Sequence, residues 1–223
     1  NGEKFVLPKL HVKANILKSE PDAESLFVEY AETLQERREA RKQSLDERVE
    51  MAKNIARTKE NCLIWCDYNN ESTALHKAIR ESVEVKGSDT PEHKEKAMMG
   101  FASGDVKYLV TKPSICGFGM NWQNCHDMIF CGLSDSYEQF YQAIRRCYRF
   151  GQKHEVNVHV IISEKEMNVL NNIKRKQADH ERMSAEMVKV MSESAKVELF
   201  GQQREKTDYI PEIAMEVPLW FPF

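Results

Sequence analysis

Short apolar runs alternate with amphipathic stretches through the middle of the chain. The runs CLIWC, VKYLVT, DMIFCG and VNVHVII are rich in β-branched and aromatic residues, as β-strands are. Helical spacing of apolar residues marks the stretches ESTALHKAIRES, PEHKEKAMMGFAS and YEQFYQAIRRCYRF. Strands that alternate with helices need crossover connections, which produce a mostly parallel sheet with helices on both faces. Residues 58–163 are therefore expected to form an α/β domain of this kind.

A different pattern precedes this domain, over residues 22–57. Apolar residues recur there at helical spacing, at Leu26, Phe27, Tyr30, Leu34, Leu45, Val49 and Ala52. They predict two amphipathic helices, the first capped by Asp22 and the second begun by a capping box of Ser44 and Glu47. Between the two lies the polar run QERREARKQS, with the basic residues Arg37, Arg38, Arg41 and Lys42. These could contact DNA, but the interleaved glutamates favour a solvated helix face.

Residues 164–223 begin with a long helical pattern. Its apolar residues are Met167, Val169, Leu170, Ile173, Met183, Met187, Val190 and Met191. Such a stripe is more often a packing surface than a ligand groove, so we expect the helix to brace the sheet. The tail PEIAMEVPLWFPF is apolar and interrupted by prolines, and we expect it to dock in an extended form.

Composition limits the function classes. The 223 residues suffice for one large domain, or for one domain with a helical appendage. The 32 basic and 35 acidic residues leave a formal net charge of −3, so any nucleic-acid site has to be local. The six cysteines form no CxxC pair and no zinc-ligand cluster, which favours reduced, buried thiols. Neither a membrane-spanning run nor a signal-peptide core is seen, so we expect a soluble, intracellular protein.

The candidate chemistry follows two of the predicted strands. In TKPSICGFGMNWQNC, Gly117 and Gly119 come directly after a strand, where glycine lets the backbone approach a ligand, although an ordinary turn would look the same. In QAIRRCYRFGQ, Arg146 and Arg149 share one face of a predicted helix, with Gln142 four residues before Arg146. Two guanidinium forks match phosphate oxygens, whereas a single arginine would more often form a surface salt bridge.

The motif order LIWCDYN, VKGSD, VTKPSICGFGMNW and QAIRRCYRFGQ resembles motifs IV to VI of the second RecA-like lobe of superfamily 2 helicases. The resemblance is strongest to Swi/Snf-type DNA translocases of phages and prophages. It covers about residues 61–163, and QAIRRCYRFGQ matches the signature Q-A-x-x-R-x-x-R-x-G-Q at every fixed position. The fold that it implies is a RecA-like helicase lobe with helical additions at both ends.

The resemblance also implies roles for single residues. Arg146 and Arg149 match the motif VI arginines, which reach toward the triphosphate of ATP and neutralise charge as the γ-phosphoryl group leaves. Gln142 matches the glutamine that helps to position motif VI. The residues that match motif V, which couples the nucleotide to DNA, are Gly117, Gly119 and Asn121. The residues that stand where the family contacts DNA phosphates are Thr111, Lys112, Gly87 and Ser88.

The sequence departs from the family pattern at Cys116, at Trp122 and in GLSDSYEQ, all near positions implied for DNA contact. No G-x-x-x-x-G-K-[ST] phosphate loop occurs. The letters LDERV imitate a Walker B box, but Asp46 and Glu47 fit the first turn of a helix, where carboxylates favour the helix dipole.

The resemblance therefore implies the second half of a two-lobe motor that works in a bacterial or phage-infected cytoplasm. ATP and Mg²⁺ would bind only with the N-terminal RecA-like lobe present. Duplex DNA would be the other partner. Residues 1–21 would connect the two lobes. This chain alone would be inactive and would hold no metal.

Two other classes of function stay open. One is an inert nucleic-acid-binding or assembly module that keeps the fold. The other is a cysteine or metal enzyme, for which Cys116 and His126 lack partners at suitable spacing.

Overall fold

The computed structural model describes residues 7–19, 30–115 and 120–200, with residues 192–200 described by their backbone alone. The chain divides into two compact units, Asn1–Ala178 and Asp179–Phe223. The strands are β1 (Leu10–Leu17), β2 (Cys62–Trp65), β3 (Ser82–Glu84), β4 (Tyr108–Thr111), β5 (Asp127–Cys131) and β6 (Val156–Ser163). The helices are α1 (Leu34–Gln43), α2 (Leu45–Ala56), α3 (Asn69–Ala78), α4 (Pro91–Ser103), α5 (Tyr137–Ile144), the short 3₁₀ helix η2 (Glu164–Glu166) and α6 (Met167–Phe200).

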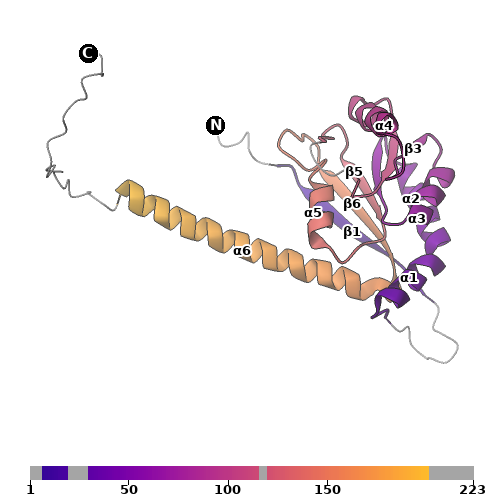
Figure 1. The fold of residues 1–223 in the computed structure, drawn as a ribbon. Coiled ribbons are helices and arrows are strands. Elements are labelled where there is room, and N and C mark those ends of the chain that lie inside the picture. Colours follow the sequence, from indigo (N-terminus) through magenta and orange to yellow (C-terminus); the bar gives the residue numbers. More distant parts are fainter. Residues whose placement is uncertain (1–6, 20–29, 116–119, 201–223) are drawn as a thin grey trace, which may run out of the picture. The chain divides into compact units, whose positions relative to one another are not determined.

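The strands of the first unit form one sheet with the order β1-β6-β5-β2-β4-β3 (Figure 1). Every neighbouring pair in it is parallel. The parallel α/β fold expected for residues 58–163 is thus confirmed. The sheet also contains two strands that the sequence analysis did not name. One is β3, and the other is β1, which lies in the segment 1–21 expected to connect two lobes.

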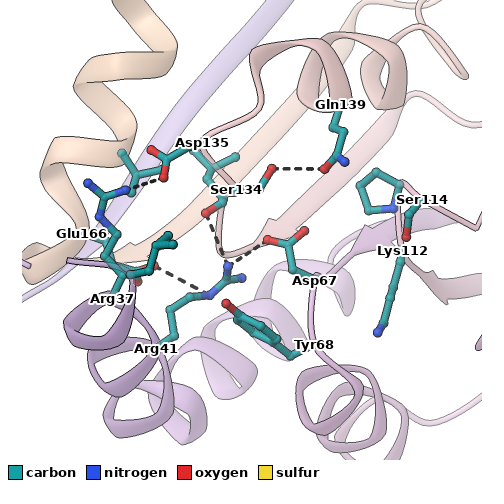
Figure 2. Close-up of a pocket in the computed structure, with 14 residues that line it drawn as sticks. Arg37, Arg41, Asp67, Tyr68, Lys112, Ser114, Ser134, Asp135, Gln139 and Glu166 are labelled. Carbon is teal, nitrogen blue, oxygen red and sulfur yellow. Dashed lines mark hydrogen bonds and ion pairs between the residues drawn. The ribbon is translucent and has the colours of Figure 1, made fainter. Parts of the chain in front are cut away.

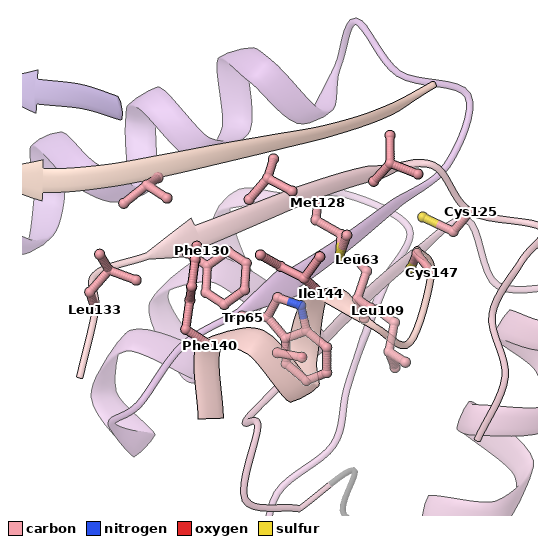
Figure 3. Packing of buried hydrophobic residues seen from close by; sticks show 14 of the residues in the cluster. Leu63, Trp65, Leu109, Cys125, Met128, Phe130, Leu133, Phe140, Ile144 and Cys147 are labelled. Carbon is pink, nitrogen blue, oxygen red and sulfur yellow. The ribbon is translucent and has the colours of Figure 1, made fainter. Parts of the chain in front are cut away.

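Two hydrophobic layers cover the sheet because successive side chains of a strand point to opposite faces. Ile64 and Ile129 belong to the layer that α2 and α3 complete. Leu63 and Phe130, one position away in each strand, belong to the other layer, where they lie near Phe140 and Ile144 of α5 (Figure 3). Side chains of α4 and of the first turns of α6 belong to the same layer. The alternation explains why the central strands read as unbroken apolar runs in the sequence.

The polar run itself forms helix α1, which precedes the lobe. Thr33 and Glu36 form a capping box, in which the Thr33 hydroxyl accepts from the Glu36 N–H at 3.2 Å and the Glu36 carboxylate accepts from the Thr33 N–H at 3.1 Å. Helix α1 therefore begins at Leu34. The box expected at Ser44 is not formed, since its hydroxyl donates to the Ala40 carbonyl at 2.8 Å. Asp22 lies outside the described residues.

Helix α6 has two different parts. Val169, Leu170 and Ile173 are buried in the first unit, in agreement with the packing expected of them. The later apolar residues that were also expected to pack are 58–65 % exposed, namely Met183, Met187, Val190 and Met191. Among the side chains of α6 that the structure describes, those of the first turns are the ones that pack in the first unit. The tail expected to dock, residues 211–223, lies outside the described residues.

Candidate functional site

One group of candidate residues lies at the carboxyl edge of the sheet, where parallel α/β folds commonly bind ligands. Gly87 and Ser88 form an exposed turn beyond β3, and the Lys94 ammonium donates to the Gly87 carbonyl at 2.7 Å. Lys112 directly follows the neighbouring strand β4, and its ammonium donates to the Asn69 side chain at 2.6 Å. The structure thus places Gly87, Ser88 and Lys112 at one edge, with accessible polar groups.

Thr111 belongs to the same edge but is fully buried as the last residue of β4. Its hydroxyl donates to the Val85 carbonyl at 3.2 Å. This bond links the ends of β3 and β4. In this conformation the Thr111 hydroxyl therefore holds the two strand ends together and is not presented to solvent.

A cavity of about 300 Å³ opens at this edge beside Lys112 (Figure 2). Its charged lining residues are Arg37, Arg41, Asp67, Lys112, Asp135 and Glu166. Cations and carboxylates are thus equal in number. The Arg37 guanidinium pairs with the Asp135 carboxylate, and Arg41 lies over the ring of Tyr68 with 4.7 Å between its Cζ and the ring centroid.

Beneath the cavity lies a network of buried charges. Arg41 is 5 % exposed and pairs with Asp67 at 2.8 Å, with Glu71 at 3.0 Å and, less closely, with Glu166 at 3.7 Å. Arg48 is fully buried and pairs with the same Glu71 carboxylate at 2.9 Å. The solvated helix face expected for the basic run is therefore wrong for Arg41, because its guanidinium lies among carboxylates of the lobe.

The same expectation is wrong for Arg37, which is only partly exposed beside Asp135, and it is confirmed for the exposed Arg38 and Lys42. The spacing of Arg37 and Arg41, four residues apart, puts both on the helix face that meets the lobe. The polar pattern of the run concealed this face because the partner carboxylates come from distant parts of the chain.

Burial and charge act against each other within the network. Burial disfavours the charged form of Arg41, but the carboxylates of Glu71, Asp67 and Glu166 outweigh it and raise the pKa of this guanidinium above its ordinary value. For Glu166, burial raises the pKa of the carboxyl, although Arg41 and Arg48 act to lower it. Arg41 thus stays fully charged, whereas burial disfavours the charged form of Glu166.

The network also fixes the loop that follows β5. The two terminal nitrogens of Arg41 donate to the carbonyls of Leu133 and Cys131, each at 3.4 Å, and Arg48 donates to the Cys131 carbonyl at 2.9 Å. Between these carbonyls Gly132 has a φ of +99°, and a Cβ there would collide with the Arg41 guanidinium. Glycine is required at this position by both the backbone angle and the close approach of the side chain.

The arginines of QAIRRCYRFGQ do not lie on a helix. Helix α5 ends at Ile144, and the chain continues in tight turns, in which the Arg146 N–H donates to the Ala143 carbonyl at 3.2 Å and the Arg149 N–H to the Cys147 carbonyl at 3.1 Å. The expectation that Arg146 and Arg149 share one helical face is therefore wrong. Arg146 is partly exposed and Arg149 exposed. We refer to residues 145–152 as the arginine turn.

The arginine turn lies at the far end of α5 from the carboxyl edge of the sheet. It contacts the segment that leads into the amino end of β5, where the Trp122 N–H donates to the Arg146 carbonyl at 2.9 Å. Asn121 is exposed in that segment, so the structure brings Asn121 and Arg146 close together along the backbone. Gln142 is exposed on α5 itself, and Gly117 and Gly119 lie outside the described residues.

The candidate residues therefore form two groups, separated by the length of α5 and β5. Cys62, Cys66, Cys125, Cys131 and Cys147 belong to neither, since they are free and buried, as expected. Among the residues that the structure describes, no group of three or more His, Cys, Asp or Glu side chains could hold a metal ion. No helix in the same residues is long and apolar enough to cross a membrane.

Residues 25–151 match the family described as "Helicase conserved C-terminal domain", and the match covers more than half of the 223 residues. The chain belongs to this family. Solved structures share the fold of this helicase C-terminal domain. It is similar to the structure described as "Crystal structure of the C-terminal part of Fun30 ATPase domain", with a TM-score of 0.50 and 20 % identity over 57 % of this chain and 44 % of that chain.

A DEAD box protein from the hyperthermophile Methanococcus jannaschii is similar at a TM-score of 0.51 and 19 % identity, over 59 % of this chain and 37 % of that chain. At such identities the likeness concerns the fold alone. The helicase C-terminal domain described here spans less than half of the length of either protein. No protein with a curated description matches the sequence.

Proposed function

We propose that this helicase C-terminal domain is the second motor lobe of an ATP-dependent DNA translocase of the Swi/Snf type. The proposed translocase comes from a phage or prophage and acts in the cytoplasm. In this role it supplies Arg146 and Arg149 to ATP held by an N-terminal RecA-like lobe. The observation that carries the proposal is the accessible arginine turn, in a chain that has the family's fold and the complete motif VI signature. The Swi/Snf subtype and the phage origin rest on the motif order alone.

The chemistry of the arginine turn fits a triphosphate. A guanidinium stays charged at all physiological pH values, and its planar donors match phosphate oxygens. Groups of this kind lower the barrier to phosphoryl transfer by neutralising charge that develops in the transition state. When bound between the lobes, ATP with Mg²⁺ supplies the phosphoryl group. Arg149 is exposed and Arg146 partly so, as contact with a second lobe requires.

The carboxyl edge of the sheet provides the proposed DNA track. Lys112 offers a cation there, and Gly87 and Ser88 offer backbone N–H groups and a hydroxyl in an exposed turn. Contacts of this type position a phosphate backbone without reading bases. Thr111 joins the track only if its hydroxyl leaves the Val85 carbonyl. Because the ATP-facing and DNA-facing groups lie at opposite ends of α5, the domain connects the two ligands through its own core.

The test is the ATPase activity of the two-lobe protein with duplex DNA. Arg149→Ala and Arg146→Ala should each lower kcat by about 10³-fold, with a much smaller change in KM for ATP, as expected of groups that act on the transition state. Arg149→Lys should restore little, because lysine lacks the planar fork. This chain alone should hydrolyse no ATP above background.

Arg145→Ala is the matched control. Arg145 is exposed in the same turn, but its guanidinium donates to the Tyr141 hydroxyl at 2.9 Å and stacks on that ring. Its removal should leave kcat unchanged. If Arg145→Ala and Arg149→Ala behaved alike, or if this chain alone showed DNA-stimulated turnover, the proposed role of the arginine turn would be refuted.

A further inference from the structure

Gln152 closes the arginine turn and is 6 % exposed, although it is a polar side chain next to exposed residues. The two hydrogens of its Nε2 are shared among three carbonyls, those of Gln123 at 3.1 Å, Cys125 at 3.1 Å and Cys147 at 3.2 Å. Its Oε1 accepts from the N–H groups of Lys153 at 2.9 Å and His154 at 3.0 Å. The whole hydrogen-bonding capacity of one amide is therefore used to bind backbone.

These bonds connect two separate segments. The Cys147 carbonyl belongs to the arginine turn, between Arg146 and Arg149, whereas the carbonyls of Gln123 and Cys125 belong to the segment that enters β5. A single NH₂ group thus holds the middle of the turn against the segment that enters β5. The Cys125 and Cys147 carbonyls are buried, since both residues are fully buried. Without Gln152, the Cys125 carbonyl would lose the one donor described for it, whereas the Cys147 carbonyl would keep the Arg149 N–H at 3.1 Å.

Two further hydrogen bonds connect the same two segments. The Trp122 N–H donates to the Arg146 carbonyl at 2.9 Å, and the Gln123 side-chain amide donates to the Phe150 carbonyl. Gly151 has a φ of +95°, which allows the chain to reverse between Phe150 and Gln152. Trp122 itself is fully buried and packs edge-on against Phe101, with 5.5 Å between ring centroids. The segment that supports the turn is therefore anchored in the core.

We infer that Gln152 is a positioning residue for the phosphate-facing arginines of the motor. The inference rests on the proposed function, because it assigns to Gln152 the placement of the groups that act on ATP. Helix α5 ends before the first of these arginines, so the helix does not set their direction. The direction is set by where Gln152 holds the Cys147 carbonyl. A displacement of a catalytic group by about 1 Å can lower a rate by about 100-fold.

Two substitutions in the two-lobe protein compare the loss of the whole Gln152 amide with the loss of its NH₂ donor alone. Gln152→Met keeps the length of the side chain and removes all of its polar atoms. Gln152→Glu keeps an oxygen for the N–H groups of Lys153 and His154 but places a second oxygen against the three carbonyls. Both should lower kcat by about 10- to 100-fold, with KM for ATP and the affinity for duplex DNA changed less than about threefold.

Asn124→Ala is the matched control. The Asn124 side-chain amide lies on the same segment and donates to the Phe101 carbonyl at 2.6 Å, but no bond joins it to the arginine turn among those described. Its loss should lower the thermal midpoint and leave kcat within about twofold of wild type, as expected of a contact that serves only stability. A structural role for Gln152 would make the Gln152 and Asn124 variants alike in kcat.

A second measurement needs no activity. In this chain alone, hydrogen exchange of backbone N–H groups in residues 145–154 should become faster in Gln152→Met and stay unchanged in Asn124→Ala, because local protection reports local opening. Unchanged protection in Gln152→Met would overturn the inference. So would a normal kcat of both Gln152 variants beside an inactive Arg149→Ala. Normal turnover of Arg149→Ala itself would instead refute the proposed function, and the inference with it.

Discussion

Glu71 should contribute strongly to the stability of the domain. Its carboxylate is 1 % exposed and accepts two hydrogen bonds from Arg41, one from Arg48 and two from the backbone N–H groups of Asp67 and Tyr68, at 2.9–3.1 Å. It joins α1, α2 and α3 in one charged centre. Glu71→Ala would remove the acceptor of all these donors at once.

The magnitude follows from which donors keep a partner. Arg41 retains Asp67 and Glu166, so most of its charge stays compensated. Arg48 is fully buried, and Glu71 is the one carboxylate with which an ion pair is described for it. Removing one partner of a buried ion pair typically destabilises a protein by about 3–5 kcal/mol, because the other charge stays buried. We expect Glu71→Ala to fall in this range, which corresponds to a urea midpoint lower by roughly 1–2 M.

The assay is urea unfolding of this chain, followed by the fluorescence of the buried Trp65 and Trp122 and by far-UV circular dichroism. Glu50→Ala is the control, since Glu50 pairs with Lys53 at 2.7 Å on an exposed face of α2. Its midpoint should stay unchanged, as is usual for exposed pairs. Arg48→Met in the Glu71→Ala background should recover part of the loss, because it removes the unpaired charge.

A destabilisation by Glu71→Ala of less than about 1 kcal/mol would refute the reasoning, since a surface contact could account for it. A similar loss for Glu50→Ala would refute it as well. The double variant gives a separate check. If Arg48→Met made Glu71→Ala still less stable, uncompensated charge would not be the cause of the effect.

Three further predictions concern pH, thiols and DNA. Burial raises the pKa of the Glu166 carboxyl in the folded state. Its contribution to the free energy of unfolding is therefore full below pH 4.5 and is lost as pH rises through the folded-state pKa. Glu166→Gln should thus be more stable than wild type at pH 7 and equal to it near pH 4, as measured by urea titration. Burial raises the pKa of the Cys131 thiol to about 12, so a Cys116→Ser variant should react with a thiol reagent only on unfolding, and rapid labelling of the folded chain would contradict this. Lys112→Ala in the two-lobe protein should reduce the salt dependence of DNA binding by about one phosphate contact on all sequences alike, and a slope equal to that of the exposed-residue control Lys96→Ala would contradict it.

The sheet could be predicted because its central strands are buried on both faces and read as apolar runs in the sequence. Strand β1 was missed although Leu10, Val12, Ala14 and Ile16 alternate with polar residues at the period of a strand; of these four, Leu10 and Ala14 are partly buried and Val12 and Ile16 are exposed. The turn VKGSD was recognised as a motif, but the three-residue strand β3 before it was too short for a pattern. The signal for β1 was present in the sequence, whereas that for β3 was not.

The site was predicted less completely, because its geometry depends on contacts between distant residues. The basic run of α1 looks solvated in the sequence, since nothing local reveals that Arg41 meets carboxylates at positions 67, 71 and 166. The end of α5 was likewise hidden. Helical spacing continues past Ile144, but a bond from the Trp122 N–H to the Arg146 carbonyl ties that carbonyl to another segment. Tertiary contacts overrode local propensity at both places.

The strand order has a consequence for how the domain is made. Strand β1 pairs with β6 from Leu10 opposite Val156 to Leu17 opposite Ser163, so the first strand of the sheet meets the last one in the sequence. During synthesis β1 emerges before the other strands of the sheet and has no partner until the chain has been extended through Ser163. Such distant pairing slows folding, because the entropy of closing a long loop is lost before the contact forms. The sheet should therefore be completed late, when β6 pairs with both β5 and β1. A nascent chain halted before β6 would expose the unpaired edges of β5 and β1.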